Sequence, residues 1–203
     1  AGINIPAGIL ADMWRSQVAL ILAASLSSLA IGYLIIGVSP GYGVLLVGVA
    51  VTGIGTSFWH APAFGTLAAV YPSRRATALA VHRMGGSIGD SVSPLVVGVL
   101  LGGFTLWGLE WGGLEWQSLA LLMVIPALLS AASIYFAYRG ATGGDSEGAS
   151  FRSYLESVKP LLTNSAVLSM TVLATVRAMA HNALNIFIVI YMAEDLAFSE
   201  FKI

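Results

Sequence analysis

A long uncharged stretch near the start of the chain limits the possible folds most strongly. No Asp, Glu, Lys or Arg occurs between Ser16 and Ser73, a run of 58 residues. A membrane-spanning helix needs about 20 predominantly apolar residues, so this run is long enough for two spans. The turn cluster Ser39-Pro40-Gly41-Tyr42-Gly43 divides it. The chain is only 9% charged, whereas soluble domains have about 25% charged residues. The sequence therefore predicts an integral membrane protein.

The remaining apolar runs predict an all-α polytopic membrane protein with five spans. These cover roughly residues 17–38, 44–71, 76–103, 117–138 and 161–192, and residues 1–10 are expected to end an earlier span. Segment 104–116 is predicted to be an interfacial loop, because tryptophans anchor membrane proteins at that depth. Segment 139–159 is predicted to be a solvated linker, with Pro160 in the first turn of the helix that follows. Barrel strands would be about 10 residues long and would alternate in polarity, unlike these runs.

Basic residues lie in or near alternate connections between the predicted spans. They are Arg15, Arg74, Arg75, Arg83, Arg139, Arg152 and Lys159. The intervening connections contain acidic residues and, of the basic types, only Lys202. The positive-inside rule places the first set in the cytoplasm. We therefore expect a multi-pass protein of the plasma membrane, which in a bacterium is the inner membrane.

Several classes of function lack their sequence signals. The chain has no cysteine, which excludes disulfides, thiolate catalysis and cysteine metal sites. It contains no G-x-S-x-G, H-E-x-x-H or Walker motif, and its three histidines fall in different predicted segments. The net charge of −1 gives no argument for nucleic acid as a partner. We therefore predict no catalytic residue, no metal and no cofactor.

A short segment before the first complete span carries a family resemblance. The segment Gly8-Ile-Leu-Ala-Asp12-Met-Trp-Arg15, predicted to be a cytoplasmic loop, resembles the G-x-x-x-D-R-x-G-R signature of the major facilitator superfamily. That signature lies between the second and third helices of the family, where its charges control closure. Gly8, Asp12 and Arg15 match, whereas Met13 replaces the first arginine and the second glycine is absent. Ordinary loop solvation is the alternative interpretation.

The spacing of the spans extends this resemblance to the whole chain. If the signature follows a second helix, the five spans are helices three to seven. The polar linker then falls where the superfamily joins its two six-helix halves. The resemblance implies a partial major facilitator fold with an N-terminal bundle at 1–139, a central cytoplasmic linker at 140–160 and the first helix of the C-terminal bundle at 161–203. Because the chain starts without Met and ends without a helix cap, we expect an internal fragment of a longer protein.

The third predicted span resembles the antiporter signature G-x-x-x-G-P-x-x-G-G of the superfamily's drug/proton exchangers. Two positions depart from it, because Ser93 and Val97 replace glycines. Small residues allow close helix packing, and a proline can bend a helix. Plain small-residue packing is the alternative to a role in gating. The candidates for gating or helix bending are Gly85, Gly86, Gly89, Pro94 and Gly98.

The second and third spans together look most like the fosmidomycin-resistance branch of the superfamily. That branch carries a histidine near the end of helix four and a Gly-Gly-x-x-Gly…Pro-Leu run in helix five. It has His-Pro followed by an acidic residue, whereas this chain has His60-Ala61-Pro62 without one. This difference shifts the predicted proton carrier from helix four to Asp90.

Polar residues recur at helical spacing on three of the spans, so each of these helices has one polar face. Ionisable residues at membrane depth usually face a cavity or a polar partner, so we expect the three faces to meet at a shared aqueous cavity. A hydrogen-bonded histidine or a snorkelling arginine is the structural alternative in each case. The transport and proton-coupling candidates are His60, Asp90, Arg177 and His181. The cavity-lining candidates are Thr52, Thr56, Arg83 and Asn185.

The leading interpretation is a secondary active transporter that exports a small molecule or drug in exchange for protons. One alternative is a proton-coupled uptake symporter for a sugar or small organic anion. Another, from a different class, is a membrane-embedded enzyme or a structural subunit of a membrane complex. The expected partners are the substrate, protons and the lipid bilayer, with no nucleic acid. The full-length protein is expected to be monomeric.

Overall fold

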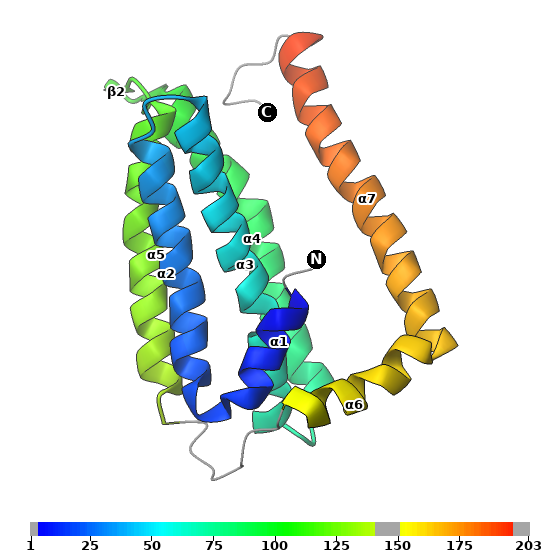
Figure 1. Cartoon of the computed structure of the whole chain (residues 1–203). Coiled ribbons are helices and arrows are strands. Elements are labelled where there is room, and N and C mark those ends of the chain that lie inside the picture. The colour runs from blue at the N-terminus through cyan, green and yellow to red at the C-terminus, as the bar shows by residue number, and fades with distance from the viewer. Residues whose placement is uncertain (1–3, 141–150, 197–203) are drawn as a thin grey trace. The chain divides into compact units, whose positions relative to one another are not determined.

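The computed structural model describes residues 4–140 and 151–196 and is almost entirely helical in these ranges (Figure 1). Five helices are long and apolar enough to cross a membrane, which confirms the predicted all-α fold class. They are α2 (Val18–Gly37), α3 (Tyr42–Val70), α4 (Arg75–Gly102), α5 (Trp116–Tyr138) and α7 (Ser165–Glu194). The shorter elements are α1 (Asn4–Met13), a 3-10 turn (Arg15–Gln17), β1 (Phe104–Leu106), β2 (Leu109–Trp111) and α6 (Phe151–Thr163).

The chain divides into two compact units. The first contains α1, α2, α3, α5 and α4 as far as Ser91. The second contains α4 from Val92, the β1–β2 hairpin, α6 and α7. In the first unit α2 lies between α3 and α5 and packs against both, while α1 packs against α3 (Figure 1). Its core is small and apolar, formed by Ala11, Val18, Leu22 and Ala63 with Trp59 and Ile134 around them.

Small residues bring α2 and α3 into close contact. The Ser25 hydroxyl donates a 2.7 Å hydrogen bond to the carbonyl oxygen of Gly55, and a Cβ on Gly55 would lie 2.8 Å from the carbonyl oxygen of Ser25. Further along the interface, a Cβ on Gly48 would lie 3.0 Å from the carbonyl oxygen of Gly32. Such close approach of two backbones is typical of small residues in membrane helices. The closest glycine packing in the described residues of this unit therefore lies between α2 and α3.

The N-terminal signature segment is helical rather than the predicted loop. We predicted a loop from Gly8 to Arg15, but α1 continues to Met13. Gly8 and Asp12 are therefore helical, and Arg15 begins the 3-10 turn. The physical reason is that no proline interrupts this segment and its backbone bonds continue, the last from the Trp14 N–H to the Leu10 carbonyl at 2.9 Å.

The connection between α4 and α5 also differs from its prediction, because it contains a short hairpin rather than an irregular loop. Strands β1 and β2 pair antiparallel from Phe104–Trp111 to Leu106–Leu109. Trp107 and Gly108, the two turn residues, have φ of 49° and 82°. Positive φ at both central residues is the requirement of a two-residue type I′ turn. The Trp111 indole donates to the Leu100 carbonyl at 3.4 Å, which ties the hairpin to the end of α4.

The segment before the last span corrects a third prediction. We predicted a solvated linker to residue 159 and a span beginning at Leu161, but α6 begins at Phe151 and Pro160 lies in its last turn. The span α7 begins at Ser165, because the Asn164 side chain caps it by accepting hydrogen bonds from the N–H groups of the two residues after Ser165 at 2.9 and 3.2 Å. Part of the predicted linker, 141–150, lies outside the described residues.

Candidate functional site

The main candidate site is a cleft between α3 and the first half of α4. It has a volume of about 330 Å³. Helix α3 continues unbroken through Pro62, and α4 continues through Pro94, so both sides of the cleft are regular helix. The residues that line the cleft are Trp59, His60, Phe64, His82, Arg83, Gly85 and Gly86.

Aromatic side chains hold the two sides of this cleft together. The His82 ring stacks on Trp59 with centroids 6.1 Å apart and an interplanar angle of 29°. The same ring meets Phe64 edge-on, with centroids 5.4 Å apart and an angle of 87°. Phe64 also lies 6.0 Å from the ring of His60. His82 thus joins α4 to α3 through two ring contacts, each worth about 0.5–1.5 kcal/mol beyond the area it buries.

The charge of the cleft is entirely basic. His60, His82 and Arg83 line it, and none of its lining residues is acidic. His82 and Arg83 lie close enough to His60 for a Coulomb interaction. In the part of the chain that the structure describes, Arg83 has no carboxylate within 4.0 Å. Within the described ranges, the cleft therefore has a guanidinium without a carboxylate partner beside two imidazoles.

Asp90 lies further along α4, outside this cleft. It follows Arg83 by seven residues, which corresponds to about 10 Å along the helix axis. Its side chain is exposed, and no ion pair joins it to Arg83 in the described ranges. Arg83 and Asp90 therefore lie two turns apart along the same helix and are not in direct contact.

The two threonines on the predicted face of His60 are bonded to their own helix. The Thr52 hydroxyl donates to the Val49 carbonyl at 2.8 Å, and the Thr56 hydroxyl donates to the Thr52 carbonyl at 3.0 Å. The Thr52 methyl group lies against Gly32 of α2. Neither threonine lines the cleft, so the structure does not bring them together with His60 at that site.

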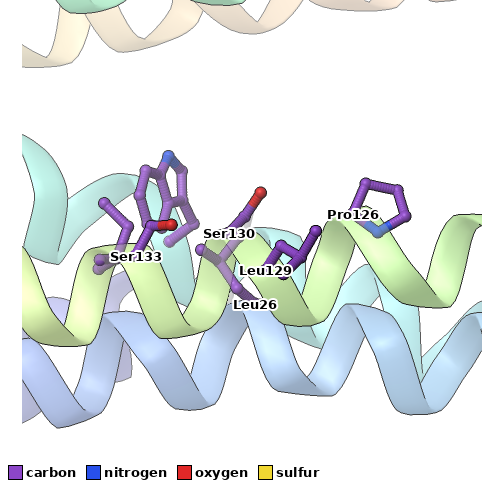
Figure 2. A pocket seen from close by; sticks show the side chains of 7 residues that line it. Leu26, Pro126, Leu129, Ser130 and Ser133 are labelled. Atoms are coloured by element: carbon purple, nitrogen blue, oxygen red, sulfur yellow. The ribbon is translucent and has the colours of Figure 1, made fainter.

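Two further cavities adjoin Trp59, a residue that its sequence position alone does not mark as part of a site. An open pocket of about 580 Å³ lies between α5 and Trp59, with Pro126, Ser130 and Ser133 along one side of α5 (Figure 2). A smaller cavity of about 60 Å³ is lined by both Trp59 and His82. Trp59 therefore borders three cavities. Its position within a span could have indicated a special role, because tryptophans in membrane proteins are enriched at the interfaces.

The polar face of α7 forms as its spacing predicted. Arg177, His181 and Asn185 follow one another at intervals of four along an unbroken helix, and all three are exposed. The Asn185 amide and His181 Nε2 are hydrogen-bonded at 3.1 Å. α7 belongs to the second unit, and a shared cavity of the three polar faces stays a prediction.

The predicted glycines of α4 occupy different environments. Gly85 and Gly86 line the cleft, and a Cβ built on either of them or on Gly89 would meet no described atom within 4 Å. Gly98 is buried. Among the described residues, no group of three or more His, Asp or Glu is placed to hold a metal ion.

Comparison with known proteins gives one match. The family model described as Major Facilitator Superfamily matches residues 1–203, which is the whole chain. No curated protein and no solved structure matches it. The family match covers all five spans and both units.

Proposed function

The chain belongs to the major facilitator superfamily of secondary transporters, and from that premise we propose that it exports a small molecule in exchange for protons. The observation that carries this proposal is the α3–α4 cleft, where His60, His82 and Arg83 lie together within two membrane-spanning helices. Ionisable residues at membrane depth are costly and usually serve a pathway for substrate or protons. Imidazole titrates between about pH 5 and 8, which suits a site that responds to a proton gradient.

Asp90 is the proposed proton carrier. It lies in a predicted span, and it has no ion-pair partner among the described residues. A carboxylate in hydrocarbon is strongly favoured in its neutral form unless it is paired. Protonation would therefore make movement of α4 between two states easier, and release of the proton would oppose it. The proposed transport residues also include Arg177 and His181, which lie on α7.

Bending of α4 is the proposed mechanical step. Pro94 removes one backbone hydrogen bond from this helix, and Gly85, Gly86 and Gly89 have open space where a side chain would lie. A helix with a weakened bond ladder and few side-chain contacts can change its curvature at low cost. We propose that this change alternates the side from which the cleft is open.

The wider assignment follows the same reasoning. We propose an N-terminal bundle at 1–139, a central linker at 140–160 and the start of a C-terminal bundle at 161–203. The proposed location is the bacterial inner membrane, with the full-length protein monomeric. The His60 segment and the glycine-rich run of α4 support a likeness to the fosmidomycin-resistance branch, and fosmidomycin is therefore the first substrate to test.

The test uses the full-length protein in inverted membrane vesicles, energised to give an acidic interior. Fosmidomycin uptake into these vesicles should depend on the pH gradient and should be abolished by Asp90→Asn. A matched control is Glu110→Gln, which changes an exposed carboxylate in the hairpin and should transport normally. The proposal fails if dissipating the gradient has no effect on fosmidomycin or a panel of other toxic compounds and Asp90→Asn transports like the wild type. Gradient-driven accumulation only in right-side-out vesicles would indicate an uptake symporter instead.

A further inference from the structure

The α3–α4 cleft has an aromatic wall. Trp59 and Phe64 contact the same His82 ring, one by stacking at 29° and the other edge-on at 87°. Their orientations are therefore set by a residue of the opposite helix. The volume of about 330 Å³ is at the lower end of the roughly 300–1,000 Å³ that small-molecule sites occupy. A compact ligand with one or two fused rings suits this space.

The basic residues of the cleft favour a ligand with a negative charge. Arg83 lines the cleft beside two histidines, and no lining residue is acidic. An arginine in a membrane span normally pairs with a partner, but in the described part of the chain Arg83 has no carboxylate within 4.0 Å. Its planar fork of N–H donors matches a carboxylate in geometry. An anionic ligand would supply the partner that the described residues do not.

The glycines leave room for the ligand. A Cβ on Gly85 or Gly86 would meet no described atom within 4 Å, although both residues line the cleft. Packing against the described residues therefore does not require a glycine at either position. Because both positions line the cleft, a larger side chain there would change its lining.

We propose that this cleft binds a flat aromatic anion, whose ring packs on Trp59 and Phe64 and whose anionic group pairs with Arg83. The inference rests on the proposed function in one respect, since the bound anion would be a transported molecule; fosmidomycin, an aliphatic phosphonate, shares with this class only its anionic group. It goes further by naming the chemical class of that molecule and the residues that select it. Binding itself requires no transport and is measured separately.

The experiment is calorimetric titration of the full-length protein in lipid nanodiscs, with 2-naphthoate and its uncharged analogue 2-naphthamide as probes. Empty nanodiscs correct for partitioning into lipid. The naphthoate should bind about 10- to 100-fold more tightly than the amide, as expected for hydrogen bonds to a charged group. Arg83→Gln should remove this preference and leave naphthamide binding unchanged. Arg83→Lys should restore part of the preference, because it keeps the charge but not the fork.

Two matched variants separate the site from general effects. Arg74→Gln removes a positive charge from the exposed loop between α3 and α4, outside the cleft, and should leave both affinities unchanged. Gly86→Leu should weaken both probes about tenfold or more by filling the cleft. Gly53→Leu has the same open surroundings but lies on α3 outside the cleft lining, so it should bind both probes normally.

The inference is overturned if neither probe binds, if acid and amide bind equally, if Arg83→Gln and Arg74→Gln behave alike, or if Gly86→Leu binds like Gly53→Leu. Its failure is distinct from failure of the proposed function. If Asp90→Asn abolishes gradient-driven transport but naphthoate does not bind, the function stands and the ligand class is wrong. If naphthoate binds through Arg83 but no gradient-driven transport occurs, the site stands and the function is wrong.

Discussion

Replacing Gly55 by alanine is expected to destabilise the α2–α3 pair strongly for so small a change. The new Cβ would lie 2.8 Å from the Ser25 carbonyl oxygen and 3.2 Å from the Leu29 nitrogen. Both are backbone atoms, so no side-chain rotation can relieve the contact. The helices must separate by at least 0.6 Å at this point to reach an ordinary contact of 3.4 Å from the present 2.8 Å.

The magnitude follows from two effects of that separation. Overpacking a close contact costs about 1–3 kcal/mol. The hydrogen bond from Ser25 to the Gly55 carbonyl, now 2.7 Å, would lengthen beyond its optimum, and such interhelical bonds are worth about 0.6 kcal/mol in membrane proteins. Together these two effects cost about 1.5–3.5 kcal/mol, which is the expected difference in unfolding free energy from a glycine-to-alanine change outside the interface.

The matched control is Gly53→Ala, two residues earlier in the same helix. A Cβ there meets no described atom within 4 Å. Both substitutions gain the same intrinsic helix propensity, about 0.5–1 kcal/mol, so the difference between the variants isolates the interface. Ser25→Ala should cost about 0.6 kcal/mol alone and less in the Gly55→Ala background, where its bond is already stretched.

The assay is reversible unfolding of the full-length protein in mixed detergent micelles with increasing SDS, followed by far-ultraviolet circular dichroism. The measured quantity is the difference in unfolding free energy between Gly55→Ala and Gly53→Ala. If the two variants unfold within about 0.5 kcal/mol of one another, a difference typical of ordinary surface substitutions, the close packing of α2 and α3 at this point is not as described.

Two further predictions concern contacts outside that interface. Asn164→Ala removes the cap of α7 and should cost about 1 kcal/mol. The first amides of α7 should then exchange hydrogen roughly fivefold faster, whereas in Asn164→Asp they should exchange at the normal rate. Equal exchange in both variants would exclude a capping role. His82→Ala removes the ring contacts to Trp59 and Phe64 and should lower the unfolding free energy by about 1–3 kcal/mol. His82→Phe keeps an aromatic ring at this position and should retain most of that stability. An alanine variant as stable as the phenylalanine variant would contradict the ring contacts.

The extent of four spans could be predicted closely from residue order. Residues 17–38 were predicted for α2 (Val18–Gly37), and 117–138 for α5 (Trp116–Tyr138). The agreement has a simple cause, because backbone groups in hydrocarbon must bond within their own segment and a helix is the way a single apolar run achieves this. The last span begins four residues later than Pro160 predicts, because Pro160 lies in α6 and Asn164 caps α7.

The candidate site could be predicted only in part. Spacing alone placed Arg177, His181 and Asn185 on one face of a helix, because the period of an α-helix is local. Spacing could not show that His82 packs between Trp59 and Phe64, which depends on how α4 lies against α3. The structure also shows that His82 lines the cleft, which its position in the sequence does not indicate.

The order of residues by itself determined that this chain is a multi-pass helical membrane protein, where its spans lie and which residues are costly in hydrocarbon. Only the tertiary structure decided which faces meet. It placed close glycine contacts at Gly32, Gly48 and Gly55 between α2 and α3. It left open space at Gly85 and Gly86, two of the glycines that the sequence indicates for gating. The physical reason is that lipid and protein interior are equally apolar, so the hydrophobic pattern of a membrane helix does not distinguish the face that packs from the face that lipid covers.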